Sequence, residues 1–180
     1  MIRAALSTFE KHGYEATTIE EIARVSKVAV GGFYLHFRTK RQALLVLMDQ
    51  FLAELATLEL PADTVLGAPA AKAFVVALVH VALRVDLKYW GAFRAWHEAV
   101  LRDEALAKLQ AQIDAWTTER IVAMLHVVRR APNVRRDTDA ATLARVLNAL
   151  FWRLTEMRAG EEKAVVRATV AMVTHAIFTD

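Results

Sequence analysis

Helix breakers are scarce along this chain, and their scarcity restricts the fold more than any other feature of the sequence. The 180 residues include three prolines and six glycines. No stretch alternates apolar and polar residues between turn dipeptides, as a half-buried strand requires. Apolar residues recur instead at helical spacing, so we expect an all-α fold. The expected helices cover residues 3–12, 19–25, 29–35, 40–58, 70–86, 89–102, 104–130, 139–158 and 161–177.

The apolar content is high but does not indicate a membrane protein. Apolar residues make up 56% of the chain, and the mean hydropathy is +0.26. The best candidate span, residues 73–83, is interrupted by His80 and is far shorter than the ~20 apolar residues that cross a bilayer. No signal peptide precedes the first helical pattern, and cysteine is absent, so no disulfide framework or thiolate metal site is expected. These features predict a cytoplasmic protein that does not contact a membrane.

The excess positive charge lies in the first quarter of the chain. Residues 1–47 contain seven Lys and Arg against four Glu, a net charge of +3, whereas the rest contains 16 basic and 16 acidic residues. A basic segment of this kind is expected where a protein contacts a polyanion such as DNA. The alternative is an ordinary solvated surface.

Start and stop signals divide the N-terminal region into short helices. Gly13 ends the first helix, and Thr18 to Glu21 form a capping box in which the Thr18 hydroxyl accepts from the Glu21 amide and the Glu21 side chain reaches back. Thr39 is expected to cap a longer helix. Two short helices, a tight turn and then a long helix have the proportions of a helix-turn-helix. We therefore expect an N-terminal domain over residues 1–44 and a second domain over residues 45–180.

Two adjacent glycines lie inside the second helix of this expected helix-turn-helix. Gly31 and Gly32 each cost a helix interior roughly 1 kcal/mol relative to alanine. We interpret them as positions where the helix backbone approaches DNA closely, with Tyr34 and His36 donating hydrogen bonds to phosphates. The alternative is that the glycines end a loop and the neighbouring aromatic residues belong to the core.

The segment TTIEEIARVSKVAVGGFYLHFRTKRQAL resembles the DNA-binding domain of TetR-type transcriptional repressors. The residues in register with the family pattern are Ile22, Ala23, Val28, Gly31, Tyr34, His36, Phe37, Thr39, Lys40 and Leu44. The resemblance implies a three-helix DNA-binding domain followed by a helical domain that binds a small molecule and forms a homodimer. It also implies a repressor that a small-molecule effector releases from double-stranded operator DNA, and the aromatic residues described below predict that this effector is largely apolar.

The resemblance also implies roles for single residues. Thr18, Tyr34 and Lys40 match phosphate-contacting positions, and Val30 and Gly32 match positions that face base edges. Two residues depart from the family pattern: Lys27 replaces a turn glycine in the left-handed conformation, and Ala29 replaces a capping serine. The full set of expected DNA-binding residues is Thr18, Lys27, Ala29, Val30, Gly31, Gly32, Tyr34, His36 and Lys40.

The last two helices carry broad apolar faces that favour a dimer interface. Paired with their copies, they would form a two-fold four-helix bundle, which would place two recognition helices roughly 34 Å apart in successive major grooves. The alternative is a monomer core. The expected interface residues are Leu143, Val146, Leu147, Leu150, Phe151, Leu154, Val166, Val170, Val173 and Ile177.

Aromatic residues in the middle of the chain form the best candidate for an effector cavity, although such clusters also occur as plain core. Arg94, Glu98 and Asn148 are polar groups that would orient a ligand. The full set of expected ligand-binding residues is Phe74, His80, Trp90, Phe93, Arg94, Trp96, His97, Trp116 and Asn148.

The sequence gives little support to an enzyme. Both serines, Ser7 and Ser26, lie in the N-terminal region and cysteine is absent, so the usual nucleophiles are missing from the candidate cavity. The six histidines include no pair at metal-ligand spacing. We therefore expect no catalytic residues, no metal and no cofactor. The alternative function is a helical ligand-binding or scaffolding protein with weak or lost DNA affinity.

Overall fold

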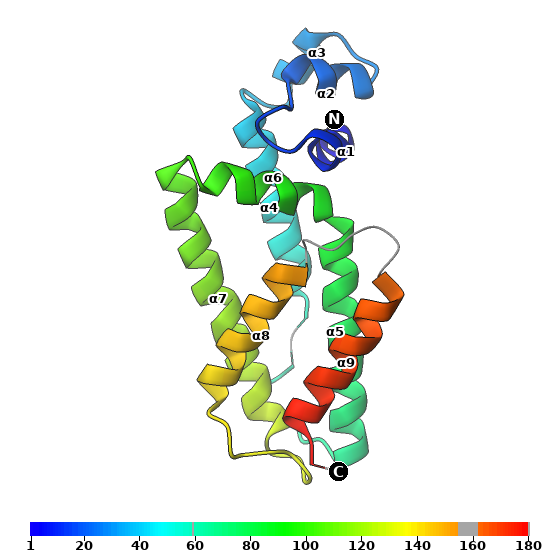
Figure 1. Cartoon of the computed structure of the whole chain (residues 1–180), viewed down its shortest axis with the longest axis vertical. Helices are drawn as coiled ribbons and strands as arrows, with labels where there is room; N and C mark the ends of the chain where they lie inside the picture. Colours follow the sequence, from blue (N-terminus) through cyan, green and yellow to red (C-terminus); the bar gives the residue numbers. More distant parts are fainter. Residues whose placement is uncertain (59, 155–161, 180) are drawn as a thin grey trace. The chain divides into compact units, whose positions relative to one another are not determined.

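The computed structural model describes residues 1–58, 60–154 and 162–179, and within these ranges the chain is helical and contains no strand (Figure 1). The all-α expectation is therefore confirmed for this part of the chain. No helix in it is long and apolar enough to span a membrane. The helices are α1 (Ile2–His12), α2 (Ile19–Val25), α3 (Val30–Tyr34), α4 (Lys40–Ala56), α5 (Ala68–Lys88), α6 (Trp90–Val100), α7 (Glu104–Val128), α8 (Ala140–Leu154) and α9 (Glu162–Ile177).

The chain divides into two compact units that are not continuous in sequence. One unit contains Met1–Ala56 and Val85–Gln110, and the other contains Thr57–Arg84 and Ala111–Asp180. This division differs from the expected boundary at residue 44, because α4 runs unbroken to Ala56 and α6 packs with the N-terminal helices. We call them the N-terminal unit and the C-terminal unit.

The expected start and stop signals operate as hydrogen-bonded caps. Thr18 accepts from the Glu21 amide at 3.2 Å, and Thr39 accepts from the Gln42 amide at 3.1 Å. Gly13 ends α1 with φ 73°. The capping box is only half formed, because the Glu21 carboxylate does not return to Thr18 but forms an ion pair with Arg24, 2.6 Å from Nη2.

The N-terminal unit has an aromatic core to which several of its helices contribute. Phe9 of α1, Phe33 of α3 and Phe93 of α6 are fully buried, and Phe93 packs edge-on against Phe51 of α4 with ring centroids 4.6 Å apart. Gly91 allows α6 to cross α1 closely, since a Cβ atom there would lie 2.4 Å from the Leu6 carbonyl oxygen. Burial of this core fixes α1, α4 and α6 together.

The C-terminal unit is a helical bundle built from parts of α5 and α7 together with α8 and α9, which lie side by side in Figure 1. A bridge between Val134 and Phe178 ties the end of α9 to the turn after α7. Arg135 strengthens this closure by donating from its backbone nitrogen to the Ile177 carbonyl at 2.8 Å. The buried core residues are Ala71, Val75, Val79, Leu83, Leu125, Val128, Ala131, Val134, Ala140, Leu143, Ala144, Leu147, Val173, Ile177 and Phe178.

Candidate nucleic-acid interface

The turn between α2 and α3 is held in the conformation that the sequence predicts. Lys27 has φ 59°, in the left-handed region that non-glycine residues adopt at a cost of about 1 kcal/mol. The backbone nitrogens of Lys27 and Val28 donate to the carbonyls of Arg24 and Ala23, at 3.0 and 3.1 Å. The turn is therefore tight despite the missing glycine, and it exposes the Lys27 side chain.

Helix α3 begins without a side-chain cap. Ala29 occupies the N-cap position with φ −65° and ψ 157° and makes no side-chain hydrogen bond. The helix therefore starts at Val30, one residue later than expected. Since serine or threonine at an N-cap typically contributes ~1 kcal/mol, α3 depends on tertiary packing for its stability.

Two aromatic residues supply that packing and fix which face of α3 turns outward. Phe33 and Phe37 are buried, with their ring centroids 5.6 Å apart. Between and beside these two rings, Val30, Gly31, Tyr34 and Leu35 remain exposed. Val30 is 37%, Tyr34 55% and Leu35 85% exposed.

The structure explains the two adjacent glycines differently. A Cβ atom added at Gly31 would meet no atom within 4 Å, whereas one at Gly32 would lie 3.1 Å from Cβ and Cγ2 of Val28. Packing against the turn therefore accounts for Gly32. Nothing within the described chain requires glycine at position 31, which lies on the exposed face.

The remaining expected contact residues on and beside this face are accessible, with one exception. Thr18, Tyr34 and His36 are exposed. The Lys40 ammonium group instead donates to the carbonyls of Tyr14, Glu15 and Thr17, at 2.8, 3.1 and 3.0 Å. All three of its protons are used, so Lys40 holds the turn between α1 and α2, and a phosphate contact would require it to release one of these carbonyls.

Other cations of this region are better candidates than Lys40 for contacts with DNA phosphates. The side chains of Lys27 and Arg38 are exposed on either side of α3 and form no hydrogen bond or ion pair with the residues that the structure describes. Arg24 and Arg41 are paired with Glu21 and Asp103. Arg38 comes shortly after the second helix in the sequence, and this position is the signal that identifies it as a candidate phosphate contact.

Residues 1–46 match the family described as bacterial regulatory proteins, tetR family. The match covers 46 of the 180 residues, and over this segment the chain is similar to the TetR family. The proteins of this family are non-enzymatic DNA-binding regulators, and for this chain the absence of enzymatic activity stays a prediction.

Individual relatives are similar over the same segment. The HTH-type transcriptional regulator YerO of Bacillus subtilis is 38% identical over 52 residues, which is 29% of this chain and 18% of the relative. The A-factor receptor protein of Streptomyces griseus is 40% identical over 50 residues, 28% of this chain and 18% of the relative. The matched segment therefore spans less than a fifth of the length of either relative.

The likeness in fold extends over the whole chain. A bacterial regulatory protein of the tetR family from Rhodococcus RHA1 superposes with a TM-score of 0.74 at 19% identity, covering 99% of this chain and 96% of that one. At this identity the comparison establishes the fold, an N-terminal helix-turn-helix followed by a helical domain.

The aromatic residues expected to line an effector cavity belong to two different units. In the N-terminal unit, Trp90 is half-buried, Phe93 packs on Phe51, and Trp96 is buried with its Nε1 donating to Gln110 at 2.5 Å. Arg94 donates from Nη1 to the Glu10 carbonyl at 2.7 Å, and His97 is half-buried in the same unit.

The other expected ligand residues lie in the C-terminal unit. Phe74 packs against the core, while His80 is exposed, with Nδ1 2.8 Å from the Val76 carbonyl oxygen. Trp116 has the Arg120 guanidinium 4.8 Å above its ring, and Asn148 is buried. An effector cavity stays a prediction. Among the described residues, no cluster of His, Asp or Glu has the make-up of a metal site.

The expected dimer-interface residues divide into core and surface. Leu143, Leu147, Val173 and Ile177 are buried within the C-terminal unit itself, so they fill its core and do not offer a surface to a second copy. The dimer interface itself stays a prediction. The half-buried residues Phe151, Leu154, Val166 and Val170 pack against the same core, Leu150 is half-buried, and Val146 is 60% exposed.

Proposed function

We propose that this chain is a DNA-binding transcriptional regulator of the TetR family and acts as a repressor. The observation that carries the proposal is the outward face of α3, where exposed Val30, Tyr34 and Leu35 surround a glycine that the fold does not require. A short helix held by two buried aromatic residues and presenting such a face suits the second helix of a helix-turn-helix, which lies in the major groove.

The charged residues around this face favour double-stranded DNA as the binding partner. Lys27 lies in the turn before α3 and Arg38 follows it, and both side chains are exposed. Cations on either side of a recognition helix suit the phosphates that border the major groove. The neighbouring carboxylate of Glu21 is neutralised by Arg24.

The experiment is a titration of labelled random-sequence duplex with the full chain at 50 to 300 mM salt, followed by mobility shift. We expect the logarithm of the association constant to fall linearly with the logarithm of the salt concentration. A Lys27→Gln, Arg38→Gln variant should bind more weakly and with a shallower slope, by about one unit per phosphate contact. Absence of salt-sensitive binding would favour a helical ligand-binding or scaffolding protein instead.

We also propose that the protein represses transcription as a homodimer. The surface of α8 and α9 that remains exposed includes Val146 and Met172, 60% and 50% exposed, along with the small residues Ala149, Ala168 and Ala171. Apolar and small side chains on neighbouring helices suit close packing against a second copy. A Val146→Glu, Met172→Glu variant should sediment as a monomer and lose affinity for a two-half-site operator.

The effector is proposed to be a small, largely apolar molecule. One relative with a similar N-terminal segment is named as a receptor, the A-factor receptor protein. Effector binding would favour a spacing of the two recognition helices that no longer matches successive major grooves. The test is a thermal-shift screen with aliphatic and aromatic compounds, in which a compound that raises Tm must also release bound duplex.

A further inference from the structure

We propose that the helix-turn-helix reads the C5 methyl groups of pyrimidines, above all of thymine, through an apolar surface formed by Val28, Val30 and Leu35. This inference rests on the proposed DNA-binding function and assigns the chemical group that the site recognises. We call these three residues the apolar α3 surface.

The side chains available at the start of α3 exclude the usual hydrogen-bonded reading of bases. From Val28 to Phe33 the sequence is VAVGGF, which offers no side-chain donor or acceptor. Direct reading of guanine or adenine typically uses Arg, Lys, Asn or Gln in bidentate contacts. In this segment such contacts are absent, so the groove must be read there by apolar contact or by shape.

The exposed apolar area on these residues needs an apolar partner. Val28 is 43%, Val30 37% and Leu35 85% exposed, at the start and the end of α3. The C5 methyl group of thymine is the one apolar group on a base edge in the major groove. A valine or leucine side chain in contact with it removes apolar surface of both partners from water.

Gly31 allows this contact to form. It follows Val30 directly in α3, and a side chain at this position would point into open space. Without that side chain, α3 can descend until the Val30 methyl groups reach the floor of the groove. A bulkier residue at position 31 would hold the helix away by the thickness of its side chain.

The charges beside the apolar α3 surface select DNA over an apolar protein partner. Lys27 and Arg38 flank it, and both are exposed without a partner among the described residues. An apolar patch bordered by cations complements a methyl-bearing groove bordered by phosphates. A hydrophobic protein surface would leave both cations without partners.

The experiment begins with selection of preferred duplexes from a random library by the full chain. Each thymidine of a selected site is then replaced in turn by deoxyuridine, which keeps every hydrogen-bonding group and removes only the methyl group. We expect a loss of about fourfold in affinity at one or more positions of each half-site, the value of one buried methyl group. In a second arm, 5-methylcytosine should bind better than cytosine at the same positions.

Two variants test whether the apolar α3 surface causes the discrimination between thymidine and deoxyuridine. Val30→Ala should lose most of the discrimination between thymidine and deoxyuridine. Leu101→Ala, which truncates an exposed leucine of the same unit outside the helix-turn-helix, should retain it. Equal discrimination in Val30→Ala and the parent chain would overturn the assignment to this surface.

The outcomes separate the inference from the proposed function. Salt-sensitive binding of selected duplexes with no effect of deoxyuridine would overturn the inference and leave DNA binding intact. Failure to select or bind any duplex would overturn the proposed function, and the inference with it. A selected site without thymine or methylated cytosine opposite α3 would likewise overturn the inference.

Discussion

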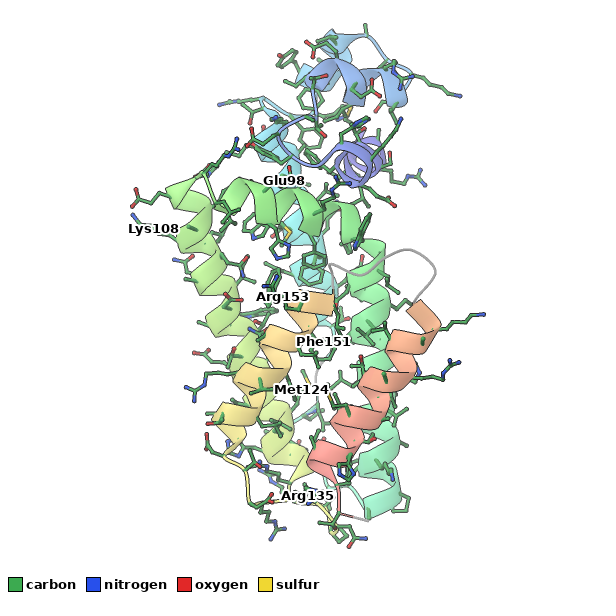
Figure 2. All side chains as sticks on the ribbon, viewed as in Figure 1. Glu98, Lys108, Met124, Arg135, Phe151 and Arg153 are labelled. Carbon is green, nitrogen blue, oxygen red and sulfur yellow. The ribbon has the colours of Figure 1, made fainter. Side chains whose placement is uncertain are left out.

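The Oε2 atom of Glu98 lies 2.6 Å from the backbone nitrogen of Tyr14 and accepts its hydrogen (Figure 2). The same oxygen accepts from the Glu15 backbone nitrogen at 3.2 Å. On the preceding turn of α6, Arg94 donates to the Glu10 carbonyl at the end of α1. Helix α6 thus supplies a donor to a carbonyl group at the C-terminal end of α1 and an acceptor for two amides of the turn that follows. These contacts fix the turn that leads into the helix-turn-helix.

Replacing Glu98 with alanine should destabilise the chain. Two backbone donors would lose a charged acceptor, which typically costs about 1–3 kcal/mol. The control is Glu104→Ala, which removes an exposed carboxylate paired only with Lys108 four residues on and should change stability by less than about 0.5 kcal/mol. Urea unfolding measures both, and equal effects would contradict the capping role of Glu98.

Alanine at Gly31 and alanine at Gly32 should have different effects when stability and duplex binding are both measured. Because a Cβ atom at position 31 has open space, Gly31→Ala should stabilise the fold by up to about 1 kcal/mol while weakening duplex binding. Gly32→Ala must displace Val28 by a few tenths of an ångström, since its Cβ atom would lie 3.1 Å away, and should stabilise less. Thermal unfolding and duplex titration separate these effects. Undiminished duplex binding by Gly31→Ala would refute a close approach of DNA at this position.

Substitution of Lys27 should likewise change the stability of the fold and the affinity for duplex DNA in opposite directions. Lys27 and Asn133 both have positive φ, 59° and 64°, so glycine at either position should relieve strain and stabilise by up to about 1 kcal/mol. Lys27→Gly should also weaken duplex binding and lower its salt slope by about one unit. Asn133→Gly lies in the C-terminal unit and should leave binding unchanged. Loss of binding in both variants would indicate a nonspecific effect.

Local signals in the sequence were sufficient to predict most of the helix boundaries. Thr18, Thr39 and Gly13 act where the expected helices start or stop, and the left-handed turn falls at Lys27. These predictions succeed because capping and turn geometry depend on neighbours within four residues. Helix α5 begins at Ala68, two residues earlier than expected, because Pro69 is tolerated in a first helical turn.

Sequence patterns could not predict the long-range contacts. Nothing local to Lys40 indicates that its ammonium group binds three carbonyls of the turn between α1 and α2. Likewise, helical periodicity identified the apolar faces of α8 and α9 but could not assign them to a neighbour in the same chain or in a second copy. The burial of Leu143 and Val173 in their own unit therefore required the fold.

Lys40 should contribute to stability more than an ordinary surface lysine. Lys40→Met keeps the length of the side chain but leaves three carbonyl groups without their charged donor and removes a cation that lies 4.6 Å from the centre of the Tyr14 ring. We expect a loss of roughly 1–3 kcal/mol. Lys108→Met, on an exposed face of α7, is the matched control. If both variants unfold at the same urea concentration, the three carbonyl contacts do not stabilise the fold.

Asp86 makes the stability of the chain depend on pH in the neutral range. Its carboxyl group is buried, and its Oδ2 atom has no hydrogen-bond partner in the described chain. Burial raises the pKa of Asp86 from 3.8 to about 8. Between these values the folded chain holds a proton that the unfolded chain releases. This stabilisation is fully present below the unfolded pKa, is lost as pH rises, and has gone above about pH 8.

The expected slope is on the order of 1.4 kcal/mol per pH unit for one proton. Asp86→Asn, which is neutral throughout, should remove this dependence when urea unfolding is followed from pH 5 to pH 8. Asp63→Asn changes an exposed carboxylate of the same charge and should leave the slope as it is. The difference in slope between the parent chain and Asp86→Asn isolates the contribution of this carboxyl group. Parallel slopes would show that Asp86 is ionised in the folded protein, and burial alone would then be an insufficient description of its surroundings.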